Sequence, residues 1–389
     1  MDSKPKFFII TTIPLSLMFF KGQITMLKTT FDVRLISSPG ELLENAARNE
    51  EAKMHAVLMS REIDFFNDTI SFFKILKLLI RERPDIIHCN TPKASLLFLI
   101  AGFILRVPCR IYYIHGFKYH GAIGLKRKFL KVIEIITCFF ASDIIAVSKG
   151  VQQEVASDLT NKEVKIIGNG SINGIDLSQF AVENYDKEQL KQNLGIGSSN
   201  YVFGFIGRLV GDKGINELVT AFVKLTANYD DITLLLVGPF EANLDPIKQE
   251  TRQEIQNNKN ILSVGFQEDV KPFLAAMNVF VFPSYREGFG MSLMEANAMN
   301  VPAISSNIIG CNEVIEEGIN GFLIKSKDET ALFNKMESCL LNKSVIEKMS
   351  LDCREVIQKK YSQDYVWANS LRTYKEIASN YFPNINFHD

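Results

Sequence analysis

Two glutamates, Glu287 and Glu295, flank a glycine-bearing loop and the start of an expected helix. A helix N-terminus attracts anions, and glycines let a ligand approach its backbone. Glu287 beside this terminus suits the hydroxyl groups of a sugar, and Glu295, about a turn into the helix, suits a ribose. The alternative is a capping acid with a solvated helix acid, which the spacing disfavours. We expect the loop N–H groups to point outward at Phe289, Gly290 and Met291.

A second loop carries two cations among three glycines, in the order Gly207, Arg208, Gly211, Lys213 and Gly214. It follows an apolar run and precedes an expected helix. Arginine offers a planar fork to phosphate oxygens, lysine offers a point charge, and glycines permit close backbone approach. The loop is therefore a candidate clamp for a polyanion such as a diphosphate. Taken alone, it is also compatible with a plain helix start that carries surface cations.

The elements that position these loops form two series of short apolar runs separated by segments with helical spacing. Such strands are typical of parallel sheets covered on both faces, and ligands bind at their carboxyl ends. We therefore expect two doubly wound α/β domains, at 1–182 and 183–362, and a C-terminal helix at 363–389 that packs back on the first domain. The expected strands are 7–11, 33–36, 56–59, 85–89, 110–114 and 143–147, then 201–206, 232–237, 261–264, 279–282 and 302–305.

Composition limits the classes of function. The chain has 389 residues, of which 47% are hydrophobic and 22% charged, as in a two-domain globular protein. Its formal net charge of −1 provides no overall basic field for nucleic acid. Six cysteines show no metal-binding spacing and are expected to be reduced core residues. The start lacks a cleavage site, and the apolar stretch 96–105 is too short to span a bilayer, so we expect a cytoplasmic protein.

The two loops together resemble the signature of the retaining glycosyltransferases of family 4, which have the GT-B fold. The resemblance covers nearly the whole chain and includes the segment 173–176, Asn-Gly-Ile-Asp, and His115 with Gly116. It implies two Rossmann-like domains that face each other across a cleft. The first would bind the acceptor and the second a UDP-sugar donor.

The resemblance also implies roles for individual residues. Glu287 would bind the hydroxyls of the transferred sugar, and Glu295 the ribose. Arg208 and Lys213 would stabilise the diphosphate as its charge grows, and His115 would reach the sugar from the first domain. On the residues alone, His115 could equally be an ordinary loop residue. The expected donor-binding set further includes Gly22, Gly207, Phe266, Gly288, Phe289, Gly290 and Met291.

The chain has no Asp-x-Asp at a strand end. Such a motif is the usual bridge from a metal ion to the diphosphate in the other main glycosyltransferase fold. Preorganised cations at the leaving group can lower the barrier without a metal. We therefore expect no divalent ion and no cofactor.

The loop with Lys21 and Gly22 has one glycine where many relatives have two. It resembles a subset of the family that acts on polyprenyl-diphosphate-linked sugars in bacterial capsule, O-antigen and N-glycan assembly. The segments 37–40 and 91–94, the latter with Lys93, share this resemblance. We therefore expect Lys21 and Lys93 on the acceptor side. His88, at the end of the strand 85–89, is at least as well explained by buried packing.

The expected helix 124–141 begins with a basic cluster among large apolar residues, namely Lys126, Arg127, Lys128 and Lys131. Such a face suits an anionic lipid surface and a diphosphate acceptor. The contact would be peripheral, on the inner face of the cell membrane. An ordinary solvated helix face is the alternative.

These observations predict a retaining, metal-independent hexosyltransferase. It would move an N-acetylhexosamine type of sugar from UDP to a polyprenyl-diphosphate-linked saccharide in bacterial surface polysaccharide or glycan assembly. Two alternatives share the fold: a sugar-nucleotide 2-epimerase, and a non-catalytic sugar-nucleotide-binding partner of another transferase. The complete set of charged residues in the two loops argues against the second alternative.

Overall fold

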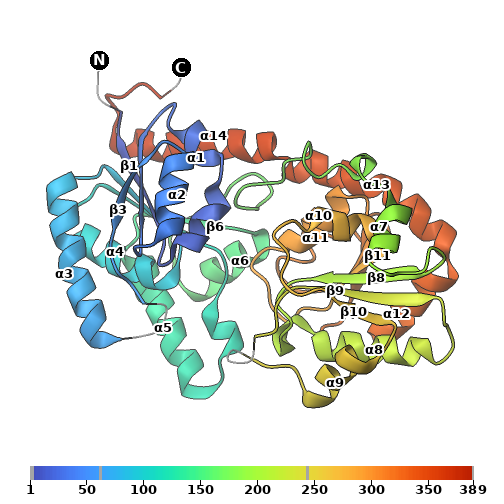
Figure 1. Ribbon diagram of the computed structural model, residues 1–389. Coiled ribbons are helices and arrows are strands. Elements are labelled where there is room, and N and C mark those ends of the chain that lie inside the picture. Colours follow the sequence, from blue (N-terminus) through green and yellow to red (C-terminus); the bar gives the residue numbers. More distant parts are fainter. Residues whose placement is uncertain (1–3, 61–63, 242–244, 388–389) are drawn as a thin grey trace. The chain divides into compact units, whose positions relative to one another are not determined.

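The structure, a computed structural model, describes residues 4–60, 64–241 and 245–387 (Figure 1). The chain folds into two compact units. The first unit combines Met1–Gly174 with Gln363–Asp389, and the second unit is Ile175–Ser362.

The boundary between the units falls after Gly174 and not after residue 182, where the composition of the chain had suggested it. Residues 175–182 are held by the second unit. Arg354 donates hydrogen bonds to the carbonyl oxygen of Leu177 at 2.5 Å and to that of Phe180. The N–H of Ile175 donates to the carbonyl oxygen of Tyr361 at 2.9 Å. These contacts, which involve backbone atoms, leave no trace in the polarity of the sequence.

The described part of the first unit contains a parallel sheet of seven strands in the order β3-β2-β1-β4-β5-β6-β7. Every residue of β4 is buried, which explains why such strands appear in the sequence as continuous apolar runs. The strands are β1 (Lys6–Ile10), β2 (Asp32–Ser37), β3 (Lys53–Ala56), β4 (Ile86–Cys89), β5 (Cys109–Ile114), β6 (Asp143–Ala146) and β7 (Val164–Ile166).

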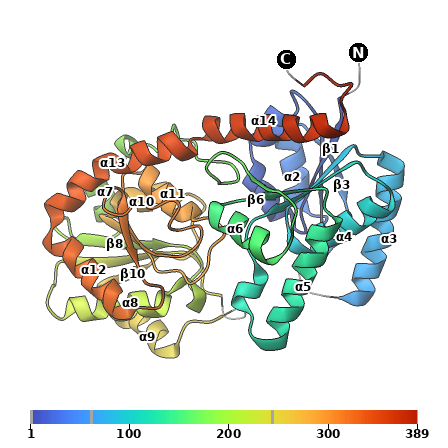
Figure 2. The same ribbon diagram turned by 180° about the vertical axis from the view of Figure 1, so that it is seen from behind.

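The helices of the first unit begin with recognisable signals. Asp64 accepts a hydrogen bond from the N–H of Asn67 at 3.1 Å and caps α3, and α4 starts with Pro92, whose missing N–H is harmless in a first turn. Helices α3, α4 and α5 lie side by side (Figure 2). The helices are α1 (Gln23–Leu27), α2 (Glu41–Asn49), α3 (Phe65–Glu82), α4 (Pro92–Ile104), α5 (Gly124–Phe140), α6 (Lys149–Asp158) and α14 (Gln363–Tyr381).

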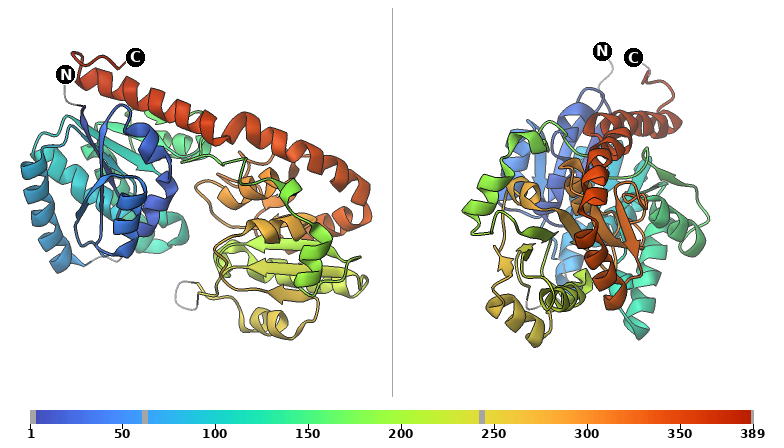
Figure 3. Two further views of the ribbon diagram at one scale, coloured as in Figure 1. Left: turned by 45° about the horizontal axis from the view of Figure 1, so that its top comes forward. Right: turned by 90° about the vertical axis from the view of Figure 1, so that its right-hand side faces the viewer.

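The C-terminal helix α14 packs within the first unit (Figure 3). It contacts α1 and β5. The hydroxyl group of Tyr381 donates to Asp143 Oδ2 at 2.6 Å, and Tyr374 is buried against the ring of Phe7. Tyr374 is therefore a core residue of the first unit, and the partly exposed Tyr381 is anchored to it by a hydrogen bond.

The described part of the second unit contains a parallel sheet of six strands in the order β10-β9-β8-β11-β12-β13. The doubly wound α/β architecture predicted for both halves is confirmed. The strands are β8 (Tyr201–Ile206), β9 (Ile232–Val237), β10 (Ile261–Ser263), β11 (Val279–Phe282), β12 (Ala303–Ser306) and β13 (Gly321–Ile324). The helices are α7 (Lys187–Asn193), α8 (Ile215–Thr226), α9 (Gln249–Asn257), α10 (Lys271–Ala276), α11 (Met291–Ala298), α12 (Glu329–Leu341) and α13 (Lys343–Tyr361).

The largest differences from the predicted elements occur at sheet edges. The apolar pattern does not predict β7 or β13, which are short edge strands with partly exposed residues. It also predicts a strand at 56–59, whereas β3 ends at Ala56. Edge strands bury one side only, so their apolar signal is weak. None of the helices within the described residues has both the length and the apolar character needed to cross a bilayer.

Candidate active site

The site in the second unit lies where the strand order of its sheet reverses. Strand β8 pairs with β9 on one side and with β11 on the other, so the connections leave the carboxyl ends of β8 and β11 in opposite directions. Open α/β sheets bind ligands in the crevice at such a point. The loop 207–214 follows β8, and the loop 283–290 follows β11. The fold therefore brings both predicted loops to one place.

Lys213 and Glu287, one from each loop, form an ion pair. Both side chains are largely buried, and Lys213 Nζ lies 5.3 Å from the centroid of the Phe282 ring. An ammonium group has three protons, so Lys213 can hold Glu287 and still donate to a phosphate oxygen. The predicted sugar-binding acid and the predicted diphosphate cation are thus direct neighbours.

The two loops are locked together through their backbones. Gly214 has a φ of +73°, and a Cβ atom there would lie 2.2 Å from the carbonyl oxygen of Pro283. The N–H of Tyr285 donates to the carbonyl oxygen of Asp212 at 2.8 Å, and the Asp212 side chain forms an ion pair with Arg286. Only glycine permits this approach at position 214. The contacts of Asp212 with Tyr285 and Arg286 join the two loops that carry Lys213 and Glu287.

Arg208 lies at the start of the first loop and points one guanidinium nitrogen, Nη1, at Glu241 Oε2, 2.6 Å away. Its side chain is 41% exposed, so other N–H groups of the fork can reach a ligand. The backbone of Gly207 packs directly against Gly238, since a Cβ atom at Gly238 would lie only 1.9 Å from the Gly207 carbonyl oxygen. Phe266, which follows β10, is exposed.

The glycine-bearing loop before α11 differs from the expectation of three outward N–H groups. The N–H of Gly290 donates to the carbonyl oxygen of Gly310 at 2.9 Å, and the N–H of Met291 donates to that of Phe289 at 2.9 Å. The prediction of outward N–H groups is therefore wrong for Gly290 and Met291. For Gly290 the cause is the approach of the loop that carries Gly310, which a local pattern does not show, whereas the acceptor for Met291 lies two residues earlier in the same loop.

Glu295 lies on α11 and is partly exposed. Burial of its carboxyl group raises its pKa to about 7, and the charge of Lys271 opposes this rise only in part. The group is therefore mostly protonated in mildly acidic solution and mostly ionised above neutrality. An ionised carboxylate can accept both hydrogen bonds of a ribose diol.

In the first unit the strand order reverses between β1 and β4, and His115 follows the neighbouring strand β5. His115 Nε2 lies 3.3 Å from Asn90 Oδ1, and its ring centroid lies 4.4 Å from that of Tyr113. Its Nδ1 atom is buried and has no partner. Burial lowers the pKa of His115 to about 3, so the ring is neutral at physiological pH.

His88 is a packing residue. Its Nε2 lies 3.0 Å from the hydroxyl oxygen of Tyr374, and its Nδ1 lies 3.0 Å from Asn90 Nδ2. Burial and, second, the neighbouring His115 lower its pKa to about 3. Both nitrogens are satisfied, so His88 supports Asn90, and Asn90 in turn contacts His115.

The loop after η1 (Pro14–Phe20) holds Gly22 at a φ of +78°. A Cβ atom there would lie 2.7 Å from the Trp367 ring. The Trp367 N–H donates to Asn173 Oδ1 at 2.6 Å, and Asn173 Nδ2 donates to the carbonyl oxygen of Lys21 at 2.9 Å. The buried Glu50 carboxylate accepts the N–H of Gly22 at 2.5 Å. The single glycine of this loop is thus fixed by α14.

Comparison with known proteins agrees with this geometry. The family model for Glycosyltransferase Family 4 matches residues 26–172, and the model for glycosyl transferases group 1 matches residues 186–360. The capsular polysaccharide biosynthesis glycosyltransferase CapM of Staphylococcus aureus is 34% identical over 93% of this chain and 94% of its own. The chain belongs to the family 4 glycosyltransferases.

Two further comparisons place this glycosyltransferase among its relatives. It is 29% identical, over 84% of each chain, to an Escherichia coli UDP-Gal:α-D-GlcNAc-diphosphoundecaprenol α-1,3-galactosyltransferase. A crystal structure of Anabaena Alr3699/HepE in complex with UDP matches with a TM-score of 0.78 at 20% identity, covering 96% of this chain and 100% of that chain. This likeness and the two doubly wound units show the GT-B fold.

The predicted acceptor-side and membrane-side cations of the glycosyltransferase have different surroundings. Lys93 forms an ion pair with Asp68 at 2.7 Å, and Lys131 forms one with Asp158 at 2.6 Å. The remaining predicted cations are exposed: Lys21, Lys126, Arg127 and Lys128. The basic cluster at the start of α5 therefore consists mainly of three consecutive side chains.

Several residues that shape the glycosyltransferase's site are absent from the sequence prediction. Asp212 and Arg286 join the two donor loops, and Glu50 and Asn90 orient the loops of the first unit. Asp212 and Arg286 do stand beside Lys213 and Glu287, so their position next to predicted residues was the available signal. No such signal points to Glu50, because its partner Gly22 lies far away in sequence.

Proposed function

We propose that this glycosyltransferase moves a sugar from a UDP-sugar to a sugar carried on polyprenyl diphosphate, with retention of the anomeric configuration. The transfer would extend a lipid-linked precursor of a bacterial surface polysaccharide or glycan. The enzyme would work as a peripheral protein on the inner face of the cell membrane. For the transferred sugar we propose an N-acetylhexosamine.

The observation that carries the donor half is the Lys213–Glu287 ion pair at the β8/β11 crevice. Lys213 and the exposed fork of Arg208 would neutralise the diphosphate, whose negative charge grows as the glycosidic bond breaks. Preorganised charges of this kind stabilise a transition state most where water is scarce. Glu287 would accept hydrogen bonds from the hydroxyls of the transferred sugar, and Glu295 from the ribose.

The role that we propose for His115 is more specific than the role that the family resemblance implies. Because its ring is neutral and Nδ1 has no partner, it would exchange a hydrogen bond with a sugar hydroxyl and would carry no charge. The acceptor hydroxyl would attack on the face that the nucleotide leaves, and the departing phosphate would take up its proton. The meeting of His115 with Glu287 around one sugar stays a prediction.

Support for the acceptor comes from the Escherichia coli relative, whose acceptor is a diphosphoundecaprenol-linked sugar. That relative uses UDP-galactose, so galactose is the first competitor to the proposed N-acetylhexosamine. Incubation of the enzyme with a panel of UDP-sugars and a GlcNAc-diphosphoundecaprenol acceptor, followed by mass spectrometry, identifies donor and product together. We expect one UDP-sugar to add a single residue to the lipid-linked acceptor.

The same panel without acceptor tests the competing functions. Conversion of a UDP-N-acetylhexosamine alone into its 2-epimer would show an epimerase and overturn the proposal. Binding of UDP without any transfer to the lipid-linked acceptor would point to a non-catalytic partner. Slow hydrolysis of the donor alone agrees with a transferase that lacks its acceptor.

The membrane contact is supported by large exposed apolar side chains on neighbouring helices. Phe65, Phe66 and Phe73 on α3 are 78%, 76% and 65% exposed, and Leu125 on α5 is 84% exposed. Lys126, Arg127 and Lys128 are exposed directly after Leu125 on α5. Apolar side chains beside cations are typical of a helix face that rests on anionic lipid.

Replacing Lys126, Arg127 and Lys128 with glutamine tests this contact. Each cation near an anionic membrane contributes about 1 kcal/mol, so we expect flotation with phosphatidylglycerol vesicles to fall at least about tenfold. Lys131→Gln is the matched control, because its partner Asp158 already neutralises it and flotation should change little. Equal flotation of the triple variant and the wild type would remove the proposed membrane face.

A further inference from the structure

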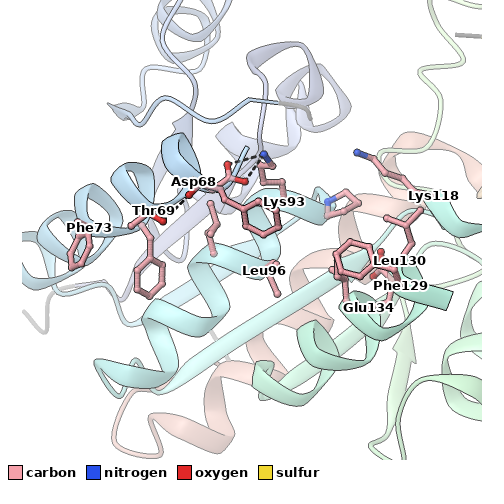
Figure 4. Close-up of a pocket in the computed structure, with 14 residues that line it drawn as sticks. Asp68, Thr69, Phe73, Lys93, Leu96, Lys118, Phe129, Leu130 and Glu134 are labelled. Carbon is pink, nitrogen blue, oxygen red and sulfur yellow. Dashed lines mark hydrogen bonds and ion pairs between the residues drawn. The ribbon is translucent and has the colours of Figure 1, made fainter. Parts of the chain in front are cut away.

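An elongated groove opens between α3, α4 and α5 of the first unit (Figure 4). Its volume is about 510 Å³. This volume lies within the range of roughly 300–1,000 Å³ that is usual for sites of small ligands. Its walls are mainly aliphatic and aromatic: Phe72, Phe73, Leu96, Leu97, Leu130 and Ile133.

The two ends of the groove differ. Figure 4 shows Phe73 at one end, and Lys118, Phe129, Leu130 and Glu134 at the other. Lys118 is exposed, whereas the buried Glu134 carboxylate accepts a hydrogen bond from the Tyr112 hydroxyl group at 2.6 Å. The Lys93–Asp68 ion pair forms part of the wall between the two ends. The groove thus offers one apolar end and one polar end, where the exposed cation Lys118 lies on the same side as the buried, hydrogen-bonded carboxyl group of Glu134.

The end of the groove that carries Lys118 lies at the carboxyl ends of β4 and β5, where we propose that the acceptor sugar reacts. Pro92 and Lys93 start α4 directly after the loop that carries Asn90, and Lys118 starts η2 (Lys118–Gly121) just after His115. Asn90 and His115 contact each other at this edge. A ligand that lies along the groove would therefore have its polar end near His115 and its apolar end toward Phe73.

We propose that this groove holds the first isoprene units of the acceptor lipid, with the lipid's diphosphate beside Lys118. This inference rests on the proposed function, because it specifies how the polyprenyl-linked acceptor is held. The cation Lys118 at one end of the apolar groove favours an anionic prenyl chain over an uncharged lipid. Lys93 and Lys118 also follow the strands β4 and β5, whose loops carry Asn90 and His115. The groove is too small for a complete polyprenyl chain. The remainder would leave it past Phe73 and Phe65, which are exposed.

The test compares two soluble acceptors that carry the same diphosphate-linked sugar, one with a farnesyl group and one with a methyl group. We expect the wild type to have a KM at least about tenfold lower for the farnesyl acceptor, because burial of hydrocarbon drives its binding. Leu97→Trp, which fills the groove, should remove most of this advantage while the KM for the methyl acceptor stays the same. If Leu97→Trp keeps the full farnesyl advantage, the inference is wrong.

Two further variants control for effects of the substitutions on folding or on the protein surface. Ile80→Trp adds the same ring to an exposed position of α3 that does not line the groove, and it should keep the farnesyl advantage. Phe73→Glu places a charge at the apolar end, and folding should tolerate it because Phe73 is 65% exposed. It should weaken the farnesyl acceptor alone, and an unchanged advantage in this variant would also overturn the inference.

A binding measurement separates failure of this inference from failure of the proposed function. Calorimetric titration with farnesyl diphosphate needs no transfer reaction. If farnesyl diphosphate binds the wild type and not Leu97→Trp while neither acceptor is glycosylated, the groove stands and the proposed function fails. If the wild type glycosylates both acceptors with equal KM, the proposed function stands and the inference about the groove fails. Equal binding of dodecyl phosphate and farnesyl diphosphate would contradict a groove built for prenyl chains.

Discussion

The crevice at β8 and β11 in the second unit carries a largely buried ion pair, whereas the edge at β1, β4 and β5 in the first unit carries neutral histidine rings. Both places have the same topological origin, at or beside the point where the order of a parallel sheet reverses. Glycine-bearing loops approach other parts of the chain closely at both. The two units therefore share one backbone topology at these places, but the place in the second unit carries charged side chains and the one in the first unit carries neutral rings.

This contrast indicates a division of labour. Negative charge builds up on a leaving diphosphate, so a unit that bound it would gain from fixed cations such as Lys213 and Arg208. The transferred sugar gains positive charge as the same bond breaks, so His115 and Asn90 would serve it better as neutral hydrogen-bonding groups than a cation would. The difference between the two edges, more than either edge alone, supports a transfer between two substrates.

The largest expected effect concerns the ion pair. Lys213→Met and Glu287→Gln should each lower kcat at least about a hundredfold, because one preorganised charge contributes roughly 3–4 kcal/mol to a transition state. Steady-state kinetics with the donor and acceptor identified by the product panel measure this effect. The matched control is Lys224→Met, which removes the cation of an exposed ion pair with Glu329 in the same unit and should leave kcat unchanged. Normal turnover of the Lys213 variant would mean that the charged edge is structural.

The next effect tests the neutral edge. His115→Ala should lower kcat about ten- to a hundredfold, which is the usual cost of leaving a buried polar partner unpaired. Because the ring is already neutral, the pH profile of kcat should show no step between about pH 5 and pH 8 that disappears in this variant. His120→Ala, a nearby histidine whose partner is Glu154, is the control and should have a smaller effect. A step in the pH profile of the wild type that is lost in His115→Ala would show that His115 titrates and that the edge at β1, β4 and β5 carries charge.

A smaller effect concerns Glu295 and pH. A raised pKa means that the carboxyl group is neutral below about pH 7 and ionised above it. Because the ionised form accepts both ribose hydrogen bonds, affinity for a UDP-sugar should rise roughly five- to tenfold from about pH 6 to about pH 8. Both phosphates of a UDP-sugar are esterified, so the ligand does not titrate in this window. Glu295→Gln should bind independently of pH, and an unchanged pH dependence in this variant would assign it to another group.

The smallest effect compares the glycines of the two edges. Alanine at Gly214 would meet the backbone of Pro283, which cannot move aside, whereas alanine at Gly22 would meet the Trp367 side chain. We expect thermal denaturation to show a Tm loss of at least about 4 °C for Gly214→Ala and a smaller loss for Gly22→Ala. Gly195→Ala is the control for backbone strain alone, because Gly195 has a φ of +70° and open space around it. Equal losses for all three variants would remove the role assigned to close approach.

The sequence predicts most of the fold and the charged half of the site. Buried parallel strands and glycine-bearing loops are local patterns, and the family resemblance assigns Lys213 and Glu287. The remainder depends on contacts between distant segments, as in the Gly310 carbonyl oxygen that accepts from Gly290, and in Trp367 against Gly22. The neutrality of His115 and the raised pKa of Glu295 depend on burial, which only the folded chain determines.

The most direct test of the division between the two edges is the dissociation constant of UDP, measured by calorimetry on the full chain. The charged edge should hold the nucleotide without help from the neutral edge. We expect Lys213→Met to raise the dissociation constant at least about tenfold, as for a lost charge-assisted hydrogen bond, and His115→Ala to leave it unchanged. The opposite pattern, with normal binding by Lys213→Met and weak binding by His115→Ala, would contradict the account.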